Sequence, residues 1–133
     1  MIRAVADTHV AVWYIFGDTR ISRTALDFIE DCVERGARVG VSAISLVEVV
    51  YLIEKRRLPG ATLTRMLKAL READGVLQEI PLDSAIAEHV PHLPRHDVPD
   101  FPDRIIAATA LRFEVPIISR DRKIRAAGLK TVW

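Results

Sequence analysis

The chain has 133 residues, a length typical of one domain that buries roughly two-thirds of its unfolded surface, and half of its residues are hydrophobic. Its 19 Lys and Arg nearly balance 18 Asp and Glu, so the charge excludes a polyelectrolyte tail and does not by itself indicate a nucleic-acid-binding protein. No apolar run approaches the roughly 18 residues of a membrane span, no signal-peptide pattern is present, and Cys32 is the only cysteine. We therefore expect a cytoplasmic protein with no membrane segment and no intrachain disulfide.

Short apolar runs and helical patterns alternate along the first half of the chain. The pattern predicts strands at 2–6 and 39–42. It predicts three helices. The first covers 8–16, the second begins after an N-cap at Ser22, and the third runs from Ser45 to the Pro-Gly pair at 59–60.

The helix predicted after residue 45 has two unusual properties. It opens with Ser-Leu-Val-Glu, the pattern of a capping box between Ser45 and Glu48. Its segment 46–53 is apolar on nearly every side and rich in valine, so propensity alone also allows a strand, but the capping box and the basic ending at 55–57 favour a helix. A helix that is apolar on every side must be buried on every side, so this segment and 10–16 indicate a surface that a partner covers.

The alternation continues through the second half. Helices are predicted at 62–71, at a short segment capped by Asp83 or Ser84, along the face 105–113 and at 121–127. Strands are predicted at 76–80, 115–119 and 130–133. Prolines interrupt the backbone between His89, His92 and His96, which favours loop histidines over a zinc site. Strands that alternate with helices predict a single α/β domain over residues 1–133, with a parallel central sheet of about 4–5 short strands flanked by helices on both faces.

Four acidic residues lie next to these predicted strands and helices. Asp7 follows the first strand, Glu48 lies in the first turn after the second, Asp103 opens an apolar helix, and Asp121 follows the run 115–119. Because the carboxyl ends of parallel strands meet at one edge of a sheet, the four carboxylates can gather there. Clustered carboxylates repel one another, and such a pocket typically holds a hard cation that can activate water against a phosphodiester. The pattern indicates a small metal-dependent nuclease.

Each acid also has a purely structural explanation. Asp7 and Asp121 can cap the helices that follow them, Glu48 completes the capping box, and Asp103 suits the dipole of a first helical turn. Taken singly, Glu48, Asp103 and Asp121 favour that explanation. Independent caps have no reason to converge on one edge of one sheet, however, so together the four favour a site.

Four segments, in their order and spacing, resemble the PIN domain and, more narrowly, the VapC-type ribonuclease toxins of type II toxin–antitoxin pairs. The resemblance covers almost the whole chain and is carried by Asp7-Thr8-His9, Ser42 to Glu48, Asp103 to Ala110 and Ile118 to Asp121. It implies a Mg²⁺- or Mn²⁺-dependent endoribonuclease. By matching positions, it implies an acidic site of Asp7, Glu48, Asp103 and Asp121, with Ser119 as a polar neighbour of the metal or the water.

The same resemblance implies two protein partners. Family members typically form homodimers, and a co-expressed antitoxin holds them inactive by filling a hydrophobic groove. By composition, the segments 10–16 and 46–53 are the candidates for that groove.

The chain departs from the family pattern around residue 100. Related toxins often read Asp-Pro-Phe-Asp-Arg where this chain has Asp100-Phe101-Pro102-Asp103-Arg104, and Val98-Pro99 stands where a His-Arg pair is common. Phe101 precedes a proline, which disfavours helical angles, so we expect Asp100 in the loop and only as an accessory residue.

The predicted reaction is in-line attack of a metal-activated water, with Arg104, Arg120 or Arg122 gripping the RNA backbone. Two alternatives are a non-catalytic module of this fold that binds RNA or protein, and a structure-specific DNA nuclease. A receiver-type phospho-acceptor domain is disfavoured, because it uses paired acids after the first strand, where this chain has a lone Asp7.

Overall fold

The computed structural model describes all residues, 1–133, and contains one five-stranded sheet. The strands are β1 (Ile2–Ala6), β2 (Arg38–Ser42), β3 (Leu77–Ile80), β4 (Ile117–Ile118) and β5 (Thr131–Val132). Their order is β3-β2-β1-β4-β5, and every neighbouring pair is parallel. The predicted α/β class with a parallel sheet is confirmed.

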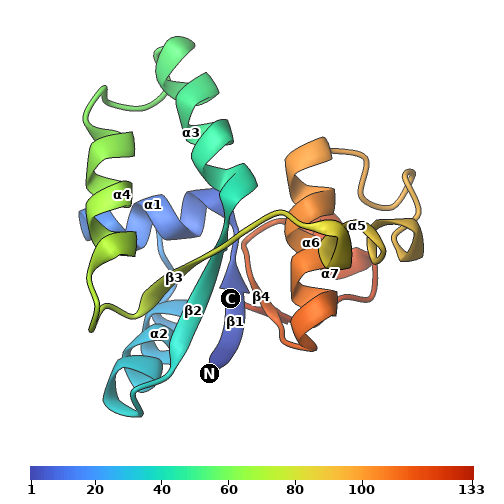
Figure 1. Ribbon diagram of the computed structural model, residues 1–133, viewed down its shortest axis with the longest axis horizontal. Coiled ribbons are helices and arrows are strands. Elements are labelled where there is room, and N and C mark those ends of the chain that lie inside the picture. The colour runs from blue at the N-terminus through green and yellow to red at the C-terminus, as the bar shows by residue number, and fades with distance from the viewer.

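Helices connect the strands and cover both faces of the sheet (Figure 1). They are α1 (Thr8–Phe16), α2 (Arg23–Glu34), α3 (Ala43–Glu54), α4 (Thr62–Arg71), α5 (Ser84–Ala87), the 3₁₀ turn η1 (Val90–His92), α6 (Phe101–Phe113) and α7 (Arg122–Ala126). In Figure 1, α1, α2, α3 and α4 lie to one side of the sheet, and α5, α6 and α7 to the other. None of these helices is long and apolar enough to cross a lipid bilayer.

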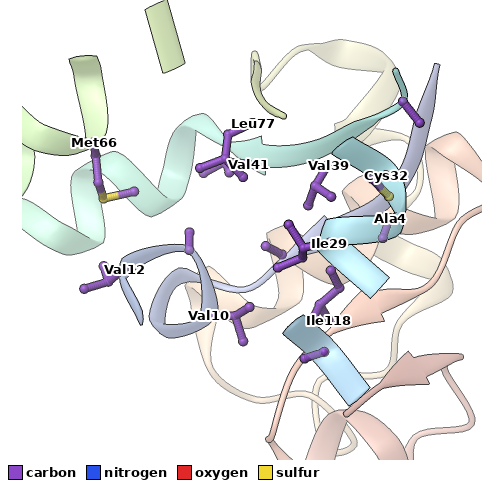
Figure 2. Packing of buried hydrophobic residues seen from close by; sticks show 14 of the residues in the cluster. Ala4, Val10, Val12, Ile29, Cys32, Val39, Val41, Met66, Leu77 and Ile118 are labelled. Carbon is purple, nitrogen blue, oxygen red and sulfur yellow. The ribbon is translucent and has the colours of Figure 1, made fainter. Parts of the chain in front are cut away.

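The alternation of side chains along the strands divides the interior into two cores. In β1, Ala4 and Ala6 belong to the core beneath α1 and α2, whereas Val5 belongs to the core beneath α6. Figure 2 shows the first core, in which side chains from α1, α2 and α4 pack against β1, β2, β3 and β4. Gly40 is needed in β2 because a Cβ there would lie 2.2 Å from the Cδ1 of Ile80. The sheet is therefore fixed between two packed layers.

The structure corrects the predicted start of α3. The N-cap is Ser42, whose hydroxyl accepts a hydrogen bond from the Ile44 N–H at 3.2 Å, and not Ser45. Ser42 is also the last residue of β2 and pairs with Ile80, so the helix begins as soon as the strand ends. The predicted capping box between Ser45 and Glu48 is therefore wrong, and Glu48 lies in the second turn with no capping role.

The chain itself covers one of the two apolar helices that were predicted to form a partner-covered surface, and leaves part of the other exposed. Residues 10–13 of α1 lie in the core and 14–16 are half-buried, so the chain itself covers this segment. On α3, in contrast, Val47 is 48% exposed and Tyr51 is 58% exposed. The outward face of α3 is an unpartnered apolar surface.

Candidate active site

The carboxyl ends of β1, β2 and β4 open onto one cavity of about 350 Å³, which we call the acidic cavity. Its walls come from α1, α3, α6 and the segment after β4. It is lined by Asp7, Thr8, His9, Trp13, Glu48, Asp100, Asp103, Arg120 and Asp121. The structure thus brings all four sequence-predicted acids, and Asp100, to a single cavity.

Two of the acids lie at the sheet edge and are tied together by Ser119. The fully buried Ser119 hydroxyl donates to Asp7 Oδ2 and accepts the Asp121 N–H at 3.0 Å. Asp7 also caps α1, because its Oδ1 accepts the Val10 N–H at 3.0 Å. Asp121 likewise caps α7 through the Lys123 N–H at 2.8 Å. Capping and convergence on the cavity are therefore compatible in these two residues.

Glu48 reaches the cavity from α3 and is held by Thr8. The Thr8 hydroxyl donates to Glu48 Oε1 at 2.6 Å and lies 2.9 Å from the hydroxyl of Ser45, which is fully buried. Sequence reasoning gave Thr8 no role at the site, and gave Ser45 only the role of a helix cap. Two features of the sequence could have indicated that these residues belong to the site: Thr8 directly follows Asp7, and Ser45 lies one turn before Glu48 on the same helical face.

Asp100 and Asp103 belong to the start of α6. Asp100 is the N-cap, and its Oδ1 accepts the Asp103 N–H at 3.1 Å. Phe101 lies in the first turn of α6, so the expectation that a residue before proline avoids helical angles is wrong for Phe101, whereas Asp100 itself lies just outside the helix in extended backbone. Pro102 is tolerated in the first turn because the N–H groups there have no partner within the helix.

The acids share a strong electrostatic field. Burial, followed by the negative charges of Asp100, Asp121, Asp7 and Glu48, raises the pKa of Asp103 to about 7. Burial also raises the pKa of Asp7, although hydrogen bonds from Ser119 and the Val10 N–H act in the opposite direction. A positive charge in the cavity would relieve this repulsion.

The donor set fits a hard divalent cation by its chemistry. Carboxylate and hydroxyl oxygens are the ligands that Mg²⁺ and Mn²⁺ prefer, and the raised pKa of Asp103 indicates a field that attracts cations. No three His, Cys, Asp or Glu side chains stand close enough together to form a complete ligand set. The cavity therefore provides the donors and the field, without a preformed cage.

The predicted arginines lie in different places. Arg104 points away from the cavity and donates to the carbonyl oxygens of Leu93 at 3.0 Å and Val90 at 3.3 Å, where it holds the η1 segment. Arg122 does not line the cavity either. Arg120 does, with its guanidinium carbon 4.7 Å from the ring centroid of Trp13. Arg120 is the cation placed nearest to the acids by the structure.

The comparison with known families decides the class of this fold. The profile of the PIN domain matches residues 4–130. The chain belongs to the PIN domain family. Over 126 residues, this PIN domain is 29% identical to ribonuclease VapC22 of Mycobacterium tuberculosis, covering 95% of the chain and 92% of that protein.

Solved structures of the same fold include two toxin–antitoxin systems. This PIN domain is similar to a chain in VapBC2 of Rickettsia felis bound to a DNA fragment from its promoter, with a TM-score of 0.70, 17% identity and coverage of 98% and 97% of the two chains. It is also similar to a chain in a toxin–antitoxin complex from Klebsiella pneumoniae, with a TM-score of 0.61, 25% identity and coverage of 90% and 88%. The resemblance to the PIN domain drawn from the sequence motifs is thereby confirmed.

Proposed function

We propose that this protein is a Mg²⁺- or Mn²⁺-dependent endoribonuclease that acts as the toxin of a toxin–antitoxin pair. The observation that carries the proposal is the single cavity that contains Asp7, Glu48, Asp103 and Asp121 at the carboxyl edge of a PIN-domain sheet. The similarity to ribonuclease VapC22 supports RNA as the substrate.

In this proposal the four carboxylates hold the cation. When bound, Mg²⁺ or Mn²⁺ would lower the pKa of a water molecule and offset negative charge on the scissile phosphate. Ser119 orients Asp7 through its hydroxyl and fixes Asp121 through the backbone, while Thr8 orients Glu48. Arg120, at the rim, contacts the phosphate backbone of the RNA. The protein side chains thus position the ligands and the substrate.

The exposed apolar face of α3 supports a protein partner. Val47 and Tyr51 are about half exposed and lie one turn apart on the same face of α3. On the surface of a monomer, large apolar side chains are usually scattered and do not form a continuous patch. We propose that an antitoxin or a second copy of the chain covers this face, in a cytoplasmic complex. Light scattering of the purified protein, alone and co-expressed with a candidate antitoxin, distinguishes a homodimer from an antitoxin complex.

The decisive experiment is cleavage of end-labelled total RNA by the purified protein with Mn²⁺ and with EDTA. Asp7→Asn tests the site, and Asp83→Asn is the matched control, because Asp83 caps α5 outside the cavity in the same way that Asp7 caps α1. We expect metal-dependent cleavage that Asp7→Asn abolishes and Asp83→Asn preserves. RNA binding without cleavage by the wild type would instead indicate a binding module, and preferential cleavage of DNA would indicate a DNA nuclease.

A further inference from the structure

Trp13 forms part of the wall of two cavities. One is the acidic cavity, and the other, which we call the lateral cavity, has a volume of about 330 Å³ and lies along the connection between α1 and α2. Its lining includes Trp13, Tyr14, Asp18, Thr19, Ile21 and Leu26. Because Trp13 borders both cavities, the two cavities are neighbours on the surface.

Two guanidinium groups are stacked on the same indole. The guanidinium carbon of Arg120 lies 4.7 Å from the Trp13 ring centroid, and that of Arg20 lies 5.3 Å from it. Trp13 is only 4% exposed and is packed against the rings of His9 and Trp133, so it is a fixed support and not a mobile platform. The two arginines are thereby held at the surface in defined orientations.

The charges of these arginines differ in how they are balanced. Arg20 donates to Asp18 through Nε and Nη2, with an Nη2–Oδ2 distance of 2.7 Å, and this pairing lowers the pKa of Asp18 to about 2. Arg23, also at the lateral cavity, pairs with Asp27 at 3.4 Å. Arg120 takes part in none of the ion pairs of the structure. The lateral cavity is therefore close to neutral, whereas the guanidinium of Arg120 borders the acidic cavity without a direct ion-pair partner.

The chemistry along this surface changes in three steps. The carboxylates of the acidic cavity suit a metal cation, and the positively charged guanidinium of Arg120 lies next to them. Beyond Trp13 lies the lateral cavity, which is close to neutral and has mostly apolar walls. A single RNA strand presents the same sequence of requirements, with a phosphodiester at the reaction centre, a second phosphate and a flat uncharged base. Unstacked RNA bases are commonly bound against aromatic rings and arginine planes.

We propose that the lateral cavity binds the base of an RNA nucleotide next to the cleaved phosphodiester, while Arg120 contacts the intervening phosphate. This inference rests on the proposed ribonuclease function and adds to it a base-binding subsite. Phosphate is disfavoured in the lateral cavity itself, because Asp18 lies in its wall and Arg23, the one arginine of its wall, is already paired with Asp27.

The test places one negative charge inside or outside the lateral cavity. Thr19 lies at the cavity and Thr24 lies on the exposed face of α2 outside it, so Thr19→Glu and Thr24→Glu form a matched pair. Both are made in an Asp103→Asn background to prevent cleavage. Binding of a short fluorescein-labelled single-stranded RNA of mixed sequence is measured by anisotropy with Mg²⁺ present. We expect Thr19→Glu to weaken binding at least about fivefold, the loss of one stacked base, and Thr24→Glu to leave it unchanged.

A second measurement locates the base directly. The same RNA, substituted with 4-thiouridine, is photo-crosslinked to the Asp103→Asn protein, and the modified peptide is identified by mass spectrometry. Crosslinks within residues 13–26 are expected. Equal RNA affinity of the two glutamate variants, or crosslinks confined to other surfaces, would overturn the base subsite while leaving metal-dependent RNA cleavage by the wild type intact. A wild-type protein that neither binds nor cuts RNA would overturn the proposed function and the subsite together.

Discussion

The acids of the cavity come from two regions that hold their charges differently. At the sheet edge, Asp7 and Asp121 accept backbone N–H groups of the helices that they cap, and Ser119 links the two. On the helix side, Glu48 accepts only the Thr8 hydroxyl, and the raised pKa of Asp103 has no hydrogen bond among its causes. Hydrogen bonds at the sheet edge therefore offset part of the burial that raises the pKa of Asp7, whereas no hydrogen bond offsets the burial and repulsion that raise the pKa of Asp103.

This difference indicates how the protein combines folding with catalysis. Backbone hydrogen bonds favour the ionised carboxylate, so the sheet-edge acids also contribute to stability as caps. A carboxyl that is buried without such partners is a cost to the folded chain, and the cost is removed only when a cation arrives. In the proposed function, acids of the second kind would bind the cation at the expense of stability, so mutations should separate the two regions.

The largest effect is expected for Asp103→Asn. The asparagine amide keeps the shape of the Asp103 side chain but removes its charge. RNA cleavage should therefore fall at least about a hundredfold, which exceeds the loss of activity usually seen for residues that only orient a metal ligand. The metal-free protein should nevertheless become more stable. We expect a gain of about 1–2 kcal/mol in the free energy of unfolding at pH 8, after allowance for solvent screening of this partly exposed group.

The gain should depend on pH in a defined direction. The pKa of Asp103 is about 7 in the folded protein and its ordinary value is 3.8, so the folded state binds the proton more tightly. Ionisation therefore costs the folded wild type stability progressively as the pH rises from about 4 to 7. Urea unfolding in EDTA should show the two proteins equally stable near pH 4 and separated at pH 8. A gap that stays the same at every pH would contradict this account.

The next effect is expected for Ser119→Ala at the sheet edge. It removes the donor to Asp7 and the acceptor of the Asp121 N–H inside a fully buried position, so we expect a loss of about 1–3 kcal/mol in the free energy of unfolding and about 10- to 100-fold in cleavage. Ser22→Ala is the control, because the Ser22 hydroxyl caps α2 away from the cavity. The control should lose about 1 kcal/mol with unchanged cleavage. Loss of activity in both variants would indicate general destabilisation instead.

A smaller effect is expected for Thr8→Val on the helix side. The change keeps the size of the buried side chain and removes the hydroxyl that contacts Glu48 and Ser45. Water can partly replace the hydrogen bond to Glu48, so cleavage should fall about tenfold at most. Thr109→Val is the matched control, because the Thr109 hydroxyl bonds to the Ile105 carbonyl within α6, outside the cavity. Single-turnover cleavage should be reduced only in Thr8→Val, and equal rates in the two would show that Glu48 needs no orientation by Thr8.

The two regions also differ in how well the sequence predicts them. The positions of Asp7 and Asp121 follow from local patterns, because each directly ends a short apolar run and starts a helix. The contact between Thr8 and Glu48 spans 40 positions of the chain and depends on where α3 begins. Two serines near the start of that helix can act as caps, Ser42 and Ser45, and the pairing of Ser42 with Ile80 at the end of β2 selects Ser42. Strand pairing of this kind is a tertiary effect that local patterns do not contain.

The stacking of Arg120 on Trp13 was beyond prediction for the same reason. Trp13 lies within α1, the helix that follows β1, and Arg120 lies between β4 and α7, so the two residues meet because β1 and β4 are neighbours in the sheet. Sequence analysis named Arg120 as one of three arginines that could grip RNA, and it gave no reason to prefer it. Burial of Trp13 at the cavity wall supplies that reason.

Asp100 lies between the two kinds of acid and should give the smallest effect. It caps α6 like a sheet-edge acid, yet its charge is the first of those that raise the pKa of Asp103. Because asparagine is as good an N-cap as aspartate, Asp100→Asn removes the charge and keeps the cap, whereas Asp100→Ala removes both. Asp100→Asn should leave stability within about 0.5 kcal/mol, and Asp100→Ala should lose about 1 kcal/mol. If the role of Asp100 is the cap, cleavage by Asp100→Asn changes by only about threefold or less; a loss as large as that of Asp103→Asn would instead place Asp100 among the cation-binding acids.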